Sequence, residues 1–133
     1  MKTYNLFISH SWKYNDSYER LLQILYNRGY FNFKNYSVPR IDPIIGAYGD
    51  IALYSAIKNQ MSPSSAVLIL AGVYATYSKW IDAEIRIANE YNKPIIAIEP
   101  WGSERTSRIV KNSAHRIVKW NANSIVTAIR ELS

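Results

Sequence analysis

The chain has 133 residues and a formal net charge of +6, with 48% hydrophobic and 20% charged residues. This length predicts one domain over residues 1–133, and the composition excludes a disordered chain. The absence of cysteine excludes a disulfide framework and thiolate metal sites, and it favours a cytoplasmic protein. The N-terminus shows no signal-peptide pattern, and no apolar run approaches the ~20 residues that a membrane span needs. We therefore expect no membrane partner.

Short apolar runs alternate with segments of helical period along the chain. We predict strands at 4–8, 36–38, 66–70, 93–98 and 115–120, and helices at 17–28, 50–61, 78–91, 103–111 and 123–132. Segment 40–49 contains Pro43, Gly46 and Gly49, which predict a long loop. The helix that starts at Asp50 is expected to bury five apolar side chains, namely Ile51, Leu53, Tyr54, Ile57 and Met61.

The order of these elements is a strand followed by a helix, repeated about five times. The strands that contain Leu6, Val67 and Ile95 are continuously apolar, which is typical of a parallel sheet covered on both faces. Right-handed crossovers then predict an α/β fold with a doubly wound, mostly parallel five-stranded sheet and helices on both faces, as in flavodoxin. In such sheets ligands bind beyond the carboxyl ends of the strands.

Glu84 is the main candidate for chemistry at that edge. It lies one helical turn beyond Trp80, and Ala88 and Tyr91 extend the same side of the predicted helix, so the carboxylate lies on or beside an apolar stripe. An ionisable group in such a place costs free energy unless it is paired or used. Because the helix N-terminus favours an anion, we expect Glu84 to stay ionised.

Other candidates follow the ends of predicted strands or lie in the connecting loops. Backbone amides of residues 9–11 are placed to receive phosphate, and Trp12, Tyr48, Tyr77 and Trp101 are candidate stacking surfaces. The predicted substrate-binding residues are Phe7, Ser9, His10, Ser11, Trp12, Arg40, Tyr48, Tyr77, Ser78 and Trp80.

Several of these residues also have a purely structural explanation. Phe7 also suits a core position, Trp80 is better explained as a core anchor of its helix than as a ligand contact, Ser78 suits a helix cap, and Glu84 suits a solvated or ion-paired helix surface. The two histidines are distant in sequence and no carboxylates cluster, so the sequence predicts no metal site.

Two stretches resemble the Toll/interleukin-1 receptor (TIR) domain family. Residues 4–11 are similar to the first box of the family, an aromatic strand that exits into a Ser-rich loop, and residues 78–84 are similar to its Ser-x-Trp-x-x-x-Glu helix. The position after Trp80, often cysteine in this family, is Ile81. Segments 49–53 and 64–72 look most like the bacterial TIR-like proteins of Thoeris anti-phage defence, the ThsB type. The resemblance covers essentially the whole chain.

The resemblance implies an NAD+-cleaving enzyme in which Glu84 is catalytic and NAD+ is the substrate, with no resident cofactor. It also implies an ADP-ribose-derived signal, often cyclic, that activates a partner effector. The chemistry agrees with this, because nicotinamide in NAD+ is already a cationic leaving group. An ionised carboxylate then only has to stabilise an oxocarbenium-like ribose.

Other functions stay open on the sequence. One alternative is a non-catalytic TIR module that assembles with other TIR domains. Assembly into a homo-oligomer stays open as well. Another is a nucleoside deoxyribosyltransferase-like enzyme, which also uses a glutamate but ignores NAD+. Lys and Arg are spread along the chain, with the densest group in segment 105–119, and they indicate a solvated basic face or an anion site. Binding to nucleic acid is the least favoured alternative.

Overall fold

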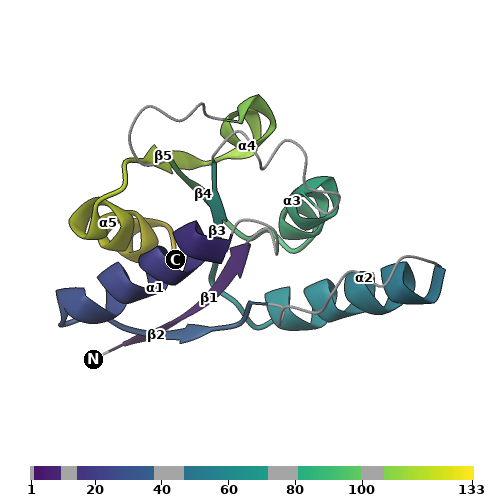
Figure 1. Ribbon diagram of the computed structural model, residues 1–133, viewed down its shortest axis with the longest axis horizontal. Coiled ribbons are helices and arrows are strands. Elements are labelled where there is room, and N and C mark those ends of the chain that lie inside the picture. The colour runs from purple at the N-terminus through teal and green to yellow at the C-terminus, as the bar shows by residue number, and fades with distance from the viewer. Residues whose placement is uncertain (1, 10–14, 38–46, 72–80, 100–106) are drawn as a thin grey trace.

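Five parallel strands form one sheet in the order β2-β1-β3-β4-β5 (Figure 1). The computed structural model describes residues 2–9, 15–37, 47–71, 81–99 and 107–133. The strands are β1 (Thr3–Ser9), β2 (Asn32–Asn35), β3 (Ala66–Leu70), β4 (Ile95–Ile98) and β5 (Arg116–Val118). The helices are α1 (Asn15–Arg28), α2 (Ala47–Met61), α3 (Ile81–Glu90), α4 (Arg108–Ser113) and α5 (Ala122–Leu132). The predicted doubly wound parallel sheet is therefore confirmed.

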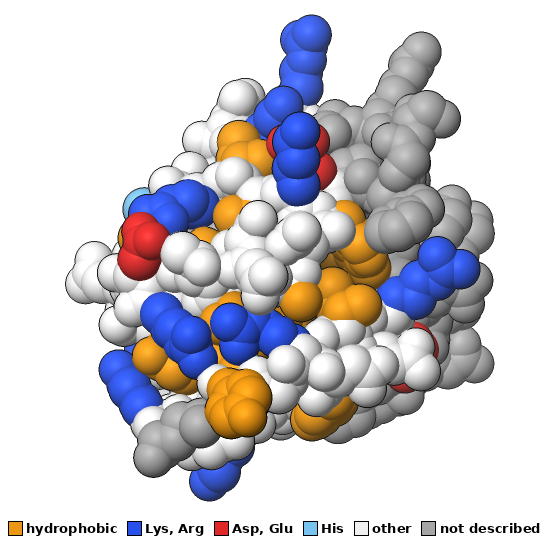
Figure 2. All heavy atoms as spheres, turned by 90° about the vertical axis from the view of Figure 1, so that its left-hand side faces the viewer, with side chains coloured by type: hydrophobic (Ala, Val, Ile, Leu, Met, Phe, Trp, Pro, Cys, Tyr) orange, Lys and Arg blue, Asp and Glu red, His pale blue; other side chains and the backbone are white. Residues whose placement is uncertain are grey.

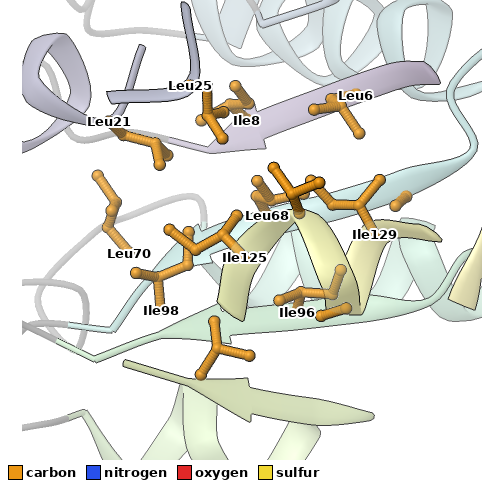
Figure 3. Packing of buried hydrophobic residues seen from close by; sticks show 14 of the residues in the cluster. Leu6, Ile8, Leu21, Leu25, Leu68, Leu70, Ile96, Ile98, Ile125 and Ile129 are labelled. Carbon is orange, nitrogen blue, oxygen red and sulfur yellow. The ribbon is translucent and has the colours of Figure 1, made fainter. Parts of the chain in front are cut away.

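Helices cover both faces of the sheet. Leu6 and Ile8 of β1 pack with α1 and α5, together with Leu68 and Ile96 of the central strands (Figure 3). Phe7 of β1 points to the opposite face, where side chains of α2, α3 and α4 complete a second cluster. Both faces of the central strands are buried, and every position of β3 and β4 carries an apolar residue. This explains why the two strands are continuous apolar runs in the sequence.

The edge strand β2 lies nearer the N-terminus than we predicted. It spans Asn32–Asn35 instead of 36–38, although the Tyr36 N–H still donates to the Leu6 carbonyl at 2.8 Å. Phe33 pairs with Tyr4 in the register of β1 and stacks near Phe31, with ring centroids 5.7 Å apart. Aromatic packing against β1 therefore determines the position of β2. Because the Asn and Lys residues of β2 are polar, a search for apolar runs in the sequence does not detect this strand.

Helix α2 begins at Ala47, inside the segment that we predicted as a loop. Ile57 and Met61 are buried as expected, but Tyr54 is only half-buried and Ile51 is 65% exposed, so the prediction for Ile51 was wrong. Ile57 and Met61, both in the C-terminal half of α2, pack into the same cluster as Phe7. The side chain of Leu53 lies outside the described residues.

The C-terminal half follows the predicted order closely. Helix α4 begins later than the predicted 103–111, β5 is an edge strand as expected, and α5 buries Ile125, Val126 and Ile129. Tyr91, expected on the apolar side of α3, is 37% exposed just beyond its end. Within the described part of the chain, no helix combines the length and the apolar character needed to cross a membrane.

Helix α5 is capped by Asn121, whose Oδ1 accepts a hydrogen bond from the Ser124 N–H at 3.0 Å. We expect Asn121→Ala to lower the free energy of unfolding by about 1 kcal/mol, because a helix-terminal N–H loses its acceptor. Urea unfolding followed by circular dichroism measures the change. Asn121→Asp keeps the acceptor and should restore most of the stability, and an alanine variant as stable as the parent would contradict the assignment.

Candidate active site

Ser9 is the last residue of β1 and lies at the carboxyl edge of the sheet. It pairs with Ile69 of β3, and it shares a face of β1 with Phe7 because side chains alternate along a strand. From β1 the chain first adds β2 on one side and then β3, β4 and β5 on the other. The gap between β1 and β3 is therefore the topological switch point of the sheet. Ser9 therefore lies where a doubly wound sheet binds its ligands.

Glu84 reaches the same place from the first turn of α3. Ile81, Ile85 and Ala88 of this helix pack into the cluster that contains Phe7, so the apolar side of α3 faces the sheet. Glu84 lies among them and is only 7% exposed. The predicted position of its carboxylate beside an apolar stripe is confirmed.

The two carboxylate oxygens of Glu84 have different surroundings. A side-chain hydrogen bond joins Ser9 to the carboxylate. The second oxygen, Oε2, is buried and has no hydrogen-bond partner among the residues that the structure describes. A buried acceptor without a partner costs roughly 1–3 kcal/mol, so this atom requires an explanation, and a ligand group that donates to it would supply one.

Burial raises the pKa of Glu84 from 4.5 to about 7, against the lowering effect of the hydrogen bond from Ser9. We had expected the helix N-terminus to keep this residue ionised. Removal of water from the carboxylate outweighs that dipole, so the charged and neutral forms are both populated near neutral pH. A buried carboxylate with a pKa raised in this way is a candidate functional residue. Its ionised form can stabilise positive charge that develops on one atom of a bound substrate.

Phe7 is buried in the core at 1% exposure and supports the face on which Ser9 lies. The predicted residues His10, Ser11, Trp12, Arg40, Tyr77, Ser78 and Trp80 lie outside the described residues, as does the stacking candidate Trp101. Tyr48 belongs to α2, but its side chain is not among those described. Of the predicted set, the structure thus brings together Ser9 and Glu84, with Phe7 on the same face of the sheet.

A second buried hydroxyl at this edge was not singled out from the sequence. Ser107 precedes α4 and is 1% exposed, and its backbone N–H donates to the carbonyl of Ala71, just beyond β3, at 2.7 Å. No motif marks it, and the only signal was the predicted helix 103–111. Within the described ranges, no group of three or more His, Asp or Glu residues is arranged to hold a metal ion.

The fold is shared with a protein of known structure. The structure of the CMP N-glycosidase BcmB of Clostridium botulinum superposes with a TM-score of 0.54 at 13% sequence identity, covering 95% of this chain and 98% of that one. At this identity the likeness concerns the fold alone. No curated protein matches the sequence.

A family model described as "Thoeris protein ThsB, TIR-like domain" matches residues 7–105. The match begins within β1 and contains both Ser9 and Glu84. Because it covers well over half of the chain, the family is established, and the resemblance seen in residues 4–11 and 78–84 is confirmed. The protein belongs to the family of TIR-like domains of the Thoeris protein ThsB.

Proposed function

We propose that this protein is an enzyme that cleaves the nicotinamide–ribose bond of NAD+ and forms a cyclic ADP-ribose-derived signal for a partner effector. The observation that carries the proposal is the buried Glu84 carboxylate at the switch point, with one hydrogen bond from Ser9 and Oε2 without a described partner. Membership in a TIR-like family supports it. The shared fold with a CMP N-glycosidase supports cleavage of an N-glycosidic bond in general.

The proposed reaction needs a negative charge rather than a proton donor. When the C–N bond breaks, both electrons move to the pyridinium nitrogen, and neutral nicotinamide leaves an oxocarbenium-like ribose. Ionised Glu84 stabilises this cation most strongly in a site that excludes water. Attack by a nitrogen of the adenine on the same molecule closes a ring, whereas attack by water gives ADP-ribose and a proton.

Product masses test the proposal. The purified protein, and extracts of phage-infected cells that express it, are incubated with NAD+ and analysed by mass spectrometry. We expect nicotinamide together with a product that lacks one water relative to ADP-ribose. If ADP-ribose were the only nucleotide product, the proposed cleavage would stand and the proposed ring closure would be wrong. If neither preparation released nicotinamide, the enzymatic proposal would be wrong.

A second candidate function is hydrolysis of a nucleotide N-glycosidic bond without NAD+. The structural likeness to the Clostridium botulinum CMP N-glycosidase favours this class of reaction. Incubation with CMP and with nucleosides separates the two functions, because release of a free pyrimidine or purine without turnover of NAD+ would select the second. Release of nicotinamide alone would select the first.

The pH dependence of NAD+ cleavage should follow the ionisation of Glu84. Since the pKa is raised to about 7 and the ionised form is the active one, kcat/KM should rise about tenfold per pH unit below the pKa and level off above it. Initial rates between pH 5 and 9, values chosen to span the pKa by roughly two units on each side, measure the profile.

Ser9→Ala provides the matched comparison for that profile. The hydrogen bond from Ser9 lowers the pKa of Glu84, so its removal should move the midpoint to higher pH. A rate that falls as the pH rises through the midpoint would show that protonated Glu84 acts as an acid, contrary to the proposed mechanism.

A further inference from the structure

Aromatic and cationic side chains gather at the amino ends of β1 and β2, opposite the candidate active site. Tyr26 is 64% exposed and packs on Phe33 with ring centroids 4.8 Å apart, and Tyr30 is 83% exposed. Figure 2 shows Lys and Arg side chains beside exposed hydrophobic side chains on the face of the molecule that lies to the left in Figure 1. We call the set Lys2, Tyr26, Arg28, Tyr30, Phe33 and Arg130 the aromatic–cationic patch.

Tyr30 is held in a backbone conformation that disfavours any side chain. Its φ is 54°, and it follows Gly29 at φ 75°. Glycine or asparagine is the usual residue at such a position, because a Cβ atom crowds the backbone there. Tyr30 is mostly exposed, so burial of its ring does not offset this strain. The backbone hydrogen bonds around Gly29 and Tyr30 must therefore hold this conformation.

Two arginines fix the backbone that presents this ring. Arg28 Nη1 donates to the Gly29 carbonyl at 3.0 Å, and Arg130 Nη2 donates to the Tyr30 carbonyl at 2.7 Å. Arg28 Nε also donates to Asn123 Oδ1 at 3.0 Å, and the Arg130 guanidinium lies 5.7 Å from the centroid of the Phe31 ring. Neither arginine forms an ion pair with a carboxylate among the residues that the structure describes. Each guanidinium therefore keeps donors for an anion.

The patch itself contains cations and no Asp or Glu. Segment 20–41 contains no Asp or Glu, and residues 1–15 contain none either. Glu131, the neighbour of Arg130, is paired with Arg116 at 3.1 Å. Lys2 lies over the Tyr4 ring, with Nζ 4.9 Å from its centroid, at the same end of the sheet. Cations that are scattered in the sequence thus meet in the fold around exposed aromatic rings.

We propose that the aromatic–cationic patch binds single-stranded nucleic acid. Stacking on Tyr30 and Tyr26 suits the flat faces of unpaired bases, and Lys2, Arg28 and Arg130 suit the phosphates between them. A duplex hides its base faces, and an acidic polypeptide has none, so neither uses the exposed rings. The patch lies at the end of the sheet away from Ser9 and Glu84, so this binding is separate from the proposed cleavage of NAD+.

Fluorescence anisotropy of the full chain with labelled oligonucleotides tests the proposal. The probes are a mixed-sequence single-stranded DNA of about 15 nucleotides, the matching single-stranded RNA, and the corresponding DNA duplex. We expect at least one single strand to bind about tenfold more tightly than the duplex, and the affinity to fall steeply with salt. The DNA and RNA arms show which of the two strands is the better ligand.

Tyr30→Gly is the decisive variant because it removes the ring and relieves the backbone strain. It should weaken binding of the single strand by roughly fivefold or more, without lowering the thermal midpoint. Arg130→Gln should weaken binding and reduce the salt slope by about one. Tyr91→Ser, which removes a partly exposed tyrosine beyond α3, is the matched control and should leave affinity unchanged.

Three results would overturn the proposal. The first is binding of the duplex as tight as that of the single strand, and the second is equal displacement of the oligonucleotide by polyglutamate. Either would identify a general anion surface instead of a site for unpaired bases. The third is undiminished binding by Tyr30→Gly, which would show that the strained tyrosine takes no part.

Discussion

Replacement of Glu84 by glutamine is expected to lower the rate of NAD+ cleavage by about a thousandfold, with the fold intact. Glutamine has the same shape and can still accept a hydrogen bond from Ser9, but it has no negative charge to oppose the charge that develops on the ribose. The loss should fall on kcat more than on KM, because the cationic ribose exists only near the transition state. Initial rates of nicotinamide release measure the effect.

Glu90→Gln is the matched control for this substitution. Glu90 is the exposed last residue of α3, so the same chemical change on the same helix should leave turnover unaltered. If Glu84→Gln retained the parental rate while circular dichroism showed a native fold, the carboxylate would have no catalytic role. An interaction module that assembles with other TIR domains would then be the better description of the protein.

The same substitution should stabilise the fold at alkaline pH. Burial raises the pKa of Glu84 from 4.5 in its ordinary state to about 7, so the native chain binds more protons than the unfolded chain between these values. Stability from this group is therefore full below about pH 4.5, falls as the pH rises toward 7, and stays reduced above it. The cost of the ionised carboxylate amounts to about 3 kcal/mol.

Glu84→Gln should therefore exceed the parent protein in free energy of unfolding by about 3 kcal/mol at pH 8, and by little at pH 5. Urea unfolding at the two pH values measures the difference, with Glu90→Gln expected to match the parent at both. A glutamine variant that is less stable than the parent at pH 8 would show that the ionised carboxylate is stabilised by the folded protein. The outcome does not depend on which substrate the enzyme uses.

Most of the fold follows from local patterns in the sequence. The central strands are continuous apolar runs because helices cover both of their faces, and their order with the intervening helices predicts the parallel sheet. The errors arose where tertiary contacts override local pattern. Strand β2 depends on the packing of Phe33 near Tyr4, and Ile51 is exposed although Ile57 and Met61 of the same helix are buried.

The site was predictable in its position and less so in its electrostatics. The placement of Ser9 and Glu84 at the same edge of the sheet was predicted from the alternation of strands and helices and from the helix motif, but the hydrogen bond between them was not. The charge state of Glu84 was not predicted either, because burial of the carboxylate in the folded protein raises its pKa. A helix dipole can be inferred from sequence, whereas the removal of water from a carboxylate needs the assembled core.

The order in which the site elements leave the ribosome has a consequence for the cell. Ser9 ends the first strand, whereas Glu84 arrives only with α3, after β3 has been made. A nascent or truncated chain that stops at β3 therefore contains the serine without its acid. Under the proposed function such fragments lack the proposed catalytic carboxylate, so the cleavage of NAD+ must wait until synthesis has passed the third helix.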